Sequence, residues 1–525
     1  MTRERGNWMT LRMLYYCIGA ALFIVAFTSP FIFETNDDTK MMMLVSGTFS
    51  GRPGDYAVFI HPLLSLFLSK LYALNAELPW YPLTWFVFVF LAYIAWVKAV
   101  CAKVVSIPNQ LLLILALICF LLQALFYLQF TVVAGLLAFS GYMLLLSHFQ
   151  GNRLSHADVW LGGILCLLSL MVRKESFFMF TVGFGILFLV QFGWQKVGKI
   201  LLARKWLILA AFLLLVYTPI YERLSGYQDY VTFNTARAKV IDHPVLSYLP
   251  LEEESDPDLY YAKNWHFRDN PAVTVMTLKD WKRELDEGLW TIEHVRQSAS
   301  FFWYEITNNK YISFLGLIYL FILFTVGGKV KEKVIFLGIW LLIIAALNHF
   351  YLVHSRVQSI IFLLPLGVAL LFFRNAEPLT NRLCTLLIAL FLLVFIIHGI
   401  NIRKGIEQRK QIIQIYKELE NLVPHSEIFF LDWRSWNVKH LDPKRMKSQD
   451  PRLFALGWQT YHPADIRLLR DKGFDKIQEI PSFYYLHSVE EENPVFPAYM
   501  EHLQDKAFRP TLIARNEMFE LLHYE

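Results

Sequence analysis

The stretch FETNDDTKMMMLVSGTFSGRPGDY, residues 33–56, follows the first long apolar run of the chain and contains two adjacent carboxylates, Asp37 and Asp38. The apolar run before it, residues 13–33, is long enough to cross a bilayer as a helix. Charged side chains close to hydrocarbon are costly, so such a pair usually faces water, a cation or a reaction. The stretch therefore predicts an acidic site at the end of the first membrane helix.

The composition of the whole chain is that of a membrane protein. Of its 525 residues, 56% are hydrophobic and 18% are charged, whereas soluble domains average about 25% charged residues. The net charge of +5 is small for this length and gives no case for nucleic-acid binding. The five cysteines lie in or beside apolar runs without CxxC spacing, so we expect buried small side chains and neither disulfides nor a metal knuckle.

Apolar runs of similar length recur along the first 400 residues and predict roughly eleven transmembrane helices. No A-x-A-like cleavage site follows the first run, which we interpret as an uncleaved span. The predicted fold class is an α-helical polytopic membrane protein, with spans near residues 13–33, 83–100, 110–127, 130–148, 157–172, 175–193, 205–221, 308–327, 332–349, 355–373 and 380–399.

Basic residues recur at alternate ends of these spans, as the positive-inside rule requires. Their distribution makes the N-terminus cytoplasmic and places the loops 34–82 and 222–307, and the chain from 401 onward, on the extracytoplasmic face of a cell (inner or plasma) membrane. The acid pair then also lies outside the cytoplasm. The basic residues on the cytoplasmic side are Arg3, Arg5, Arg12, Lys98, Lys103, Arg153, Lys196, Lys199, Arg204, Lys205, Lys329, Lys331, Lys333, Arg374 and Arg382.

Two domains follow from this pattern, a transmembrane domain over residues 1–400 and a soluble domain over residues 401–525. The segment 56–74 in the first outer loop is apolar but too short for a span, which favours a helix lying in the membrane interface and ended by the aromatic anchor Trp80-Tyr81. Beyond residue 401, IIQIYKELENL has helical spacing and SEIFFLDW reads as a strand. We expect a small extracytoplasmic α/β domain there.

Two basic groups break the sidedness pattern because they lie at outer turns. They are Arg173-Lys174-Glu175 and the segment NHFYLVHSR, which contains His354 and Arg356. Either group could consist of side chains that reach from a helix end to the interface. Both lie on the face of the acidic loop, however, which favours a shared anionic ligand. Arginine suits a phosphate because its planar fork of donors binds two oxygens at once.

The acid pair itself leaves several readings open. Asn36 or Asp37 could be the N-cap of the next helix, so that the carboxylates form a solvated helix end. In a glycosyl transfer, one carboxylate would accept the proton of an attacking hydroxyl, while positive charge stabilises a lipid-phosphate leaving group. The pair could instead bind Mg²⁺ or Mn²⁺. No P-loop, GxSxG, HExxH or GxGxxG motif offers competing chemistry.

The order of these features resembles the GT-C superfamily of integral membrane glycosyltransferases. TNDDTKMMMLVSG, residues 35–47, is similar to the acidic motif of the protein mannosyltransferase and aminoarabinose transferase-like group, and looser similarity extends to Arg173-Lys174-Glu175 and to NTARAKVIDHP, residues 234–244. The resemblance implies a polyprenyl-phosphate sugar donor and Asp37 as general base, with Asp38 in support. This chain has Asp where many members have Glu and lacks their aromatic-rich continuation, which leaves the substrate open.

The sequence thus predicts a GT-C-type glycosyltransferase that moves a sugar from polyprenyl phosphate to a glycan, lipid or protein acceptor of the cell envelope. The residues expected at the lipid phosphate are Arg173, Lys174 and Arg356, with His354 and Arg237 as further candidates. A polymerase or ligase of lipid-linked glycans shares most of these features and stays an alternative. A flippase or transporter predicts charged or broken helices near the bilayer midplane and an internal repeat, and the sequence contains neither.

Overall fold

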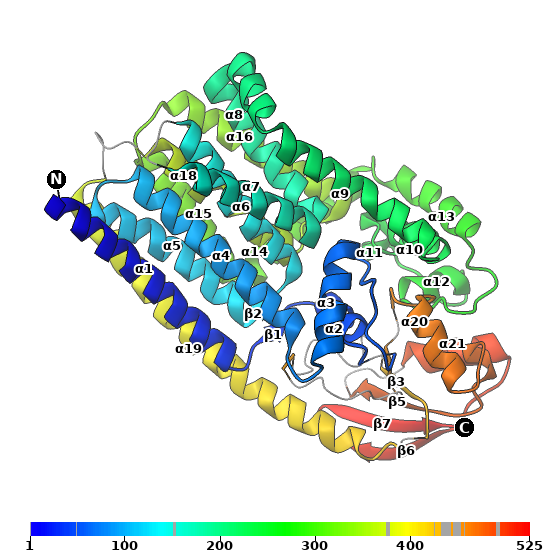
Figure 1. Ribbon diagram of the computed structural model, residues 1–525. Coiled ribbons are helices and arrows are strands. Elements are labelled where there is room, and N and C mark those ends of the chain that lie inside the picture. Colours follow the sequence, from blue (N-terminus) through cyan, green and yellow to red (C-terminus); the bar gives the residue numbers. More distant parts are fainter. Residues whose placement is uncertain are drawn as a thin grey trace.

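The computed structural model describes residues 2–48, 50–150, 154–373, 379–424, 426–431, 443–444, 453–455, 457–489 and 494–525. Long helices form a bundle, and the connecting loops and a small sheet gather at one end of it (Figure 1). We call this the loop end of the bundle.

The chain is a polytopic helical membrane protein, as predicted. In the described residues, eight helices are long and apolar enough to cross a membrane, and α14 and α15, bent by 93°, make a ninth if counted as one span. The bundle consists of α1 (Thr2–Thr28), α4 (Trp80–Lys103), α5 (Ile107–Phe126), α6 (Phe130–Phe149), α7 (His156–Val172), α8 (Lys174–Ala203), α9 (Lys205–Leu224), α14 (Ile292–Asn308), α15 (Lys310–Thr325), α16 (Val330–Tyr351), α17 (Ser355–Ile361), α18 (Leu364–Phe372) and α19 (Asn381–Glu420).

Ten of the predicted spans each coincide with one of these helices, and the span 355–373 covers two, α17 and α18. Three of the other matching helices are irregular or short. Helix α7 has 17 residues, α15 is half of the bent pair, and α8 is interrupted at Gly193, whose φ of 72° and ψ of 163° are not helical. A left-handed φ is tolerated by glycine because it lacks a Cβ. The count therefore depends on how these three helices are treated.

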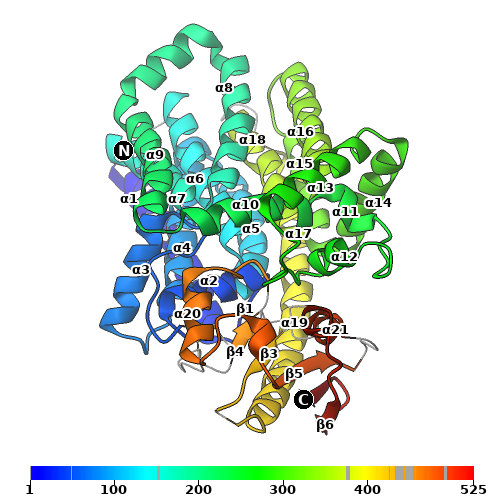
Figure 2. The same cartoon turned by 90° about the vertical axis from the view of Figure 1, so that its right-hand side faces the viewer.

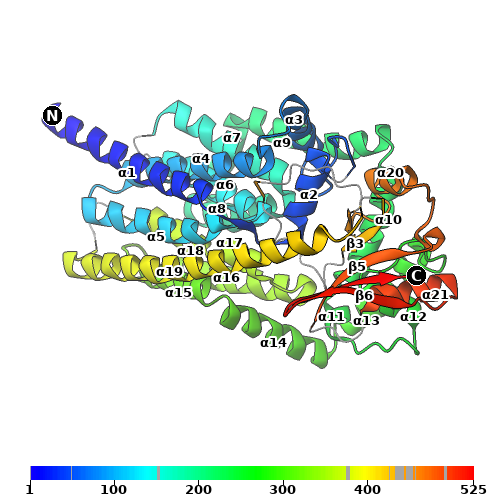
Figure 3. The ribbon, with the colours of Figure 1, turned by 90° about the horizontal axis from the view of Figure 1, so that it is seen from below.

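The two ends of the bundle differ in structure. At the end away from the loops, Lys103 donates to the Gln150 side chain and to the Leu371 carbonyl. These bonds join the end of α4 to the ends of α6 and α18. Arg153 and Arg374 lie outside the described residues. At the loop end, β1 (Ile32–Phe33) pairs in parallel with β2 (Tyr127–Leu128). In Figure 3 the long helices run across the picture, so its two sides show the two ends of the bundle. Which end is extracytoplasmic stays a prediction.

The first outer loop contains two helices, α2 (Asn36–Ser46) and α3 (Pro62–Leu74). The N-cap of α2 is Thr35, without a side-chain hydrogen bond, so the expectation that Asn36 or Asp37 caps the helix is wrong. Helix α3 confirms a helix in the apolar segment 56–74, and its position in the interface stays a prediction. Trp80 does not end that helix; it is the first residue of the span α4.

The second outer loop folds into α10 (Gln228–Ile241), α11 (Pro244–Tyr248), α12 (Pro257–Lys263) and α13 (Val275–Gly288) around a hydrophobic core of its own. Helix α10 runs across the loop end of the bundle, between the membrane helices and the C-terminal sheet (Figure 2). It is therefore placed to contribute side chains to a site at this end.

The C-terminal sheet has the order β4-β3-β5-β7-β6. Strands β4 (Leu453–Ala455), β3 (Phe429–Leu431) and β5 (Phe483–Ser488) are parallel, whereas β7 (Phe519–Tyr524) and β6 (Pro510–Arg515) continue the sheet antiparallel. Helices α20 (Pro463–Asp471) and α21 (Val495–Gln504) accompany it. Strand β3 lies in the predicted segment SEIFFLDW, whose last two residues are outside the described residues.

Helix α19 crosses residue 400 without a break, because a single helix covers Asn381–Glu420. The predicted domain boundary therefore falls inside a helix, and the division into two domains stays a prediction. The C-terminal part also packs on both outer loops. Arg268 pairs with Asp465, the Tyr499 hydroxyl donates to the Arg268 carbonyl at 2.7 Å, and His462 Nε2 donates to the Tyr56 carbonyl at 3.2 Å.

This docking makes stability depend on pH through His462. Its Nδ1 accepts from the Ala464 N–H, so the neutral ring fits and burial lowers its pKa from 6.5 to about 4. The unfolded chain takes up the proton first as pH falls, so stability is lost between about pH 6.5 and pH 4, by up to roughly 3 kcal/mol. We expect the Tm in detergent to fall less over this range in H462N than in the parent protein. Equal losses would contradict the assignment.

Candidate functional site

Asp38 is the buried member of the acid pair. Its side chain is 0% exposed and accepts hydrogen bonds from the Tyr81 hydroxyl at 2.9 Å and from the Phe130 backbone N–H at 3.2 Å. Because these donors begin α4 and α6, Asp38 ties α2 to both spans. Burial raises the pKa of Asp38, although the donors oppose the shift by favouring the ionised form. The reading of the pair as a solvated helix end is wrong for this residue.

Asp37 is the accessible member of the pair. Its side chain is 23% exposed, and one oxygen, Oδ2, lies 3.8 Å from a guanidinium nitrogen of Arg356. The other oxygen, Oδ1, accepts from the indole N–H of Trp458 at 2.9 Å. Asp37 is therefore a carboxylate with one oxygen held by a neutral donor and the other facing a cation.

Arg173 lies at the turn between α7 and α8. It is the C-cap of α7 with an extended backbone, and its guanidinium stacks 4.8 Å from the centre of the Phe130 ring. Its Nε is 3.6 Å from Glu175, and its charge interacts with those of Arg356 and Asp37. Burial lowers its pKa. The Arg173 side chain is 24% exposed and its ion pair with Glu175 is long, so its guanidinium is suited to bind a second anion.

Helix α10 contributes Arg237 and Asp242. Arg237 is 2% exposed, and its Nε donates to the Asn234 side chain at 3.0 Å. One of its terminal nitrogens is buried without a hydrogen-bond partner among the described residues. Burial lowers the pKa of Arg237 and raises that of Asp242. The charges of both residues interact with that of Asp37, so α10 belongs to the acid cluster.

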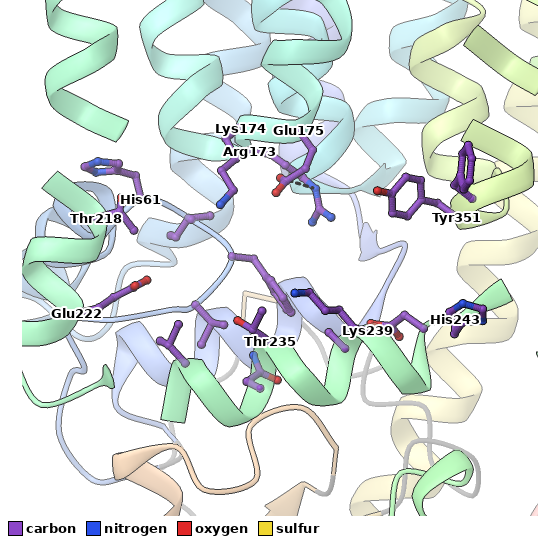
Figure 4. A pocket seen from close by; sticks show the side chains of 18 of the residues that line it. His61, Arg173, Lys174, Glu175, Thr218, Glu222, Thr235, Lys239, His243 and Tyr351 are labelled. Carbon is purple, nitrogen blue, oxygen red and sulfur yellow. Dashed lines mark ion pairs between the residues drawn. The ribbon is translucent and has the colours of Figure 1, made fainter. Parts of the chain in front are cut away.

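A cavity of about 940 Å³ opens beside this cluster. Arg173 and Lys174 line it from the α7–α8 turn, and Lys239 faces them from α10 (Figure 4). The far side is lined by uncharged and acidic groups, among them Thr218 and Glu222 of α9. The basic part of the cavity is thus wide enough for a phosphate group with substituents.

The structure brings most of the predicted site residues together. Asp37, Asp38, Arg173, Arg237 and Arg356 interact through contacts or charge, and Lys174 lines the adjoining cavity.

His354 is less central, since its side chain is 49% exposed and its Nδ1 lies 3.9 Å from Glu305. The other outer acids support the loops: Glu34 accepts from Ser355, Asp55 from Tyr227, and Asp269 from the Ile477 N–H.

Two residues of the site were not predicted. Lys239 follows Arg237 by two positions, so the two side chains leave α10 in different directions. Both residues lie in NTARAKVIDHP, so the basic character of this segment was visible in the sequence. Trp458 lies more than 400 residues after Asp37 in the chain. Only the docking of the C-terminal part brings the two side chains together.

The acid pair does not fit a metal site built from both carboxylates. The oxygens of Asp38 are fully enclosed and accept from Tyr81 and Phe130, so they present no open face to a cation shared with Asp37. Within the described ranges, no group of three or more His, Cys, Asp and Glu side chains is placed to bind an ion. The predicted binding of Mg²⁺ or Mn²⁺ at Asp37 stays a prediction.

No protein-family model matches this chain, and no curated protein does. Among solved structures, the chain is similar to the crystal structure of ArnT from Cupriavidus metallidurans bound to undecaprenyl phosphate. The identity is 10%, the match covers 97% of each chain, and the TM-score is 0.38. A likeness of this size carries no argument about chemistry. The function is therefore argued from the residues of this chain.

Proposed function

We propose that this protein is a membrane glycosyltransferase that moves a sugar from a polyprenyl-phosphate donor to a hydroxyl acceptor at the loop end of the bundle. The observation that carries the proposal is the position of Arg173. Its charge interacts with those of the acid pair, and it also lines the cavity. Arg173, whose side chain is 24% exposed, thus connects a candidate base with a space that suits a phosphorylated lipid.

In the proposed reaction, the acid pair on one side of Arg173 supplies the base, and the cavity on the other side binds the donor phosphate. The acceptor oxygen attacks the anomeric carbon of the sugar, the bond from that carbon to the phosphate oxygen breaks, and Asp37 takes the acceptor proton. Arg356 lies 3.8 Å from Asp37, beside the carboxylate oxygen that does not accept from Trp458. Arg173, Lys174 and Lys239 stabilise the charge that develops on the departing phosphate.

The cavity also offers a path for the lipid tail. Leu170 of α7, Leu214 and Leu215 of α9 and Phe350 of α16 line it beside the basic residues. On the same helix, α9, the apolar side chains of Phe212, Leu213 and Ile220 are exposed at the surface of the bundle. A polyprenyl chain can therefore leave the cavity along apolar surface while its phosphate stays at Arg173.

A polymerase or ligase that joins lipid-linked glycans would use the same base and the same phosphate site, and only the acceptor distinguishes it. A flippase or transporter needs no base. It is disfavoured by a carboxylate that is oriented by Trp458 and paired with Arg356.

Binding of polyprenyl phosphate tests the cationic part of the site. Arg173→Gln and Arg356→Gln each remove a charge that we expect to contact the donor phosphate or its surroundings, so the Kd for polyprenyl phosphate should rise by about tenfold or more, which corresponds to at least roughly 1.4 kcal/mol. Binding to purified protein in detergent measures this change.

Arg283→Gln is the matched control for these variants. Arg283 is exposed on α13, pairs with Asp280 and does not line the cavity, so its replacement should leave the Kd unchanged. An unchanged Kd in R173Q and R356Q would mean that neither arginine binds the donor. Both would then be side chains that reach from a helix end to the membrane interface.

A further inference from the structure

We infer that Trp458 is a positioning residue for Asp37 and that the C-terminal domain thereby completes the site. The inference rests on the proposed function, in which Asp37 takes a proton from the acceptor. The indole N–H donates to Oδ1 of Asp37 at 2.9 Å. Among the described residues, this hydrogen bond is the one that the Asp37 carboxylate accepts.

The indole of Trp458 is fixed from several sides. Its side chain is 4% exposed, and its ring packs edge-on against Phe59 with centroids 4.7 Å apart. Its carbonyl accepts from the Tyr230 hydroxyl at 2.9 Å. Contacts with one outer loop fix the ring and contacts with the other fix the backbone, so the N–H has a defined direction.

The backbone before Trp458 allows this approach. Gly457 has a φ of 123°, and a Cβ there would lie 2.7 Å from Nζ of Lys40, on the helix that bears Asp37. The conformation therefore favours glycine, because a side chain is strained at this φ. The same segment continues to His462, which donates to the Tyr56 carbonyl. Residues 457–462 thus attach the C-terminal domain directly to the acid cluster.

The other polar neighbours of Asp37 act through charge and do not set its orientation in the same way. Arg356 on α17 lies at 3.8 Å, and Arg173 at the α7–α8 turn, Arg237 and Asp242 on α10 and Asp38 on α2 interact with it over longer distances. A hydrogen bond is directional, whereas these interactions are not. Trp458 therefore selects which oxygen of Asp37 is free for the acceptor proton.

Trp458→Phe tests the role, because it keeps an aromatic ring against Phe59 and removes the N–H. We expect kcat for sugar transfer to fall about tenfold or more while the donor KM changes less than about twofold, since the loss falls on the chemical step. Trp458→His returns a ring N–H and should regain part of kcat, whereas a packing role alone would favour phenylalanine. Trp160→Phe, on an exposed face of α7, is the control and should leave kcat unchanged.

A second measurement needs no substrate. In a double-mutant cycle of W458F and Asp37→Ala, the Tm shifts should not add, because each change removes the same hydrogen bond. Additive shifts, or a normal kcat in W458F, would overturn the inference. Absence of sugar transfer by the parent protein would instead count against the proposed function. The double-mutant cycle would still show whether Trp458 and Asp37 interact.

Discussion

Sugar transfer falls by about 10³-fold when Asp37 is replaced by asparagine, if the carboxylate is the general base. Asparagine has the same size and can still accept the Trp458 hydrogen bond through its carbonyl oxygen, but it cannot take the acceptor proton. Polyprenyl phosphate should still bind, because Arg173 and Lys174 line the cavity independently of Asp37.

The measurement compares release of polyprenyl phosphate from a labelled donor by parent protein and by D37N. Glu77→Gln, in the exposed turn before α4, is the matched control for loss of one outer acid and should keep full activity. Expression and membrane insertion of D37N should be normal. Turnover at the parental rate would remove Asp37 from the mechanism.

The same comparison can be made in cells. Envelope glycans of a strain without this protein should lack one sugar, and D37N should not restore it whereas E77Q should. The missing sugar would also name the donor and the acceptor, which the geometry of the site does not specify.

Replacing Asp38 with alanine should damage the fold. The change leaves the Tyr81 hydroxyl and the Phe130 N–H buried without their acceptor, and each such loss costs about 1–3 kcal/mol. We expect a large drop in Tm and in folded yield. Asp37→Ala, one residue earlier and 23% exposed in the parent, should lose much less stability.

Tyr81→Phe separates the two contributions. In the parent protein it removes the donor and leaves Asp38 with its Phe130 bond, which should lower the Tm moderately. In the D38A background the same change removes a hydroxyl that is already unpaired, so it should cost little or even stabilise. A D38A protein as stable as the parent would show that Asp38 is not the link between α2 and the spans.

The adjacency of Asp37 and Asp38 shows how far the sequence could predict this site. The acid pair, the basic residues at outer turns and the spans follow from local patterns, because hydrophobic length and charge are properties of short segments. The difference between the two acids is not local. It arises because neighbours on a helix point about 100° apart, so that Asp38 meets Tyr81 and Phe130 while Asp37 meets Arg356 and Trp458.

The features that the sequence did not predict include a contact between distant segments and the continuation of a helix past the membrane. Trp458 gave no signal because a single tryptophan in a soluble-looking segment has no pattern, and its partner is defined only after the C-terminal sheet has docked. The helix boundary at residue 400 was placed by a change in composition, yet polar residues can continue a helix after it leaves the membrane, as α19 does. Helix propensity and hydropathy are separate properties.

Helix α19 also determines how the C-terminal domain can move. With 40 residues in one unbroken helix, it forms a rod about 60 Å long that starts at the far end of the bundle and ends under the sheet. Together with the contacts of His462 and Tyr499 with the outer loops, this rod joins the C-terminal sheet to the bundle at more than one point. Trp458 therefore reaches Asp37 from a part of the chain that is joined to the bundle through α19 and to the outer loops through Phe59 and Tyr230.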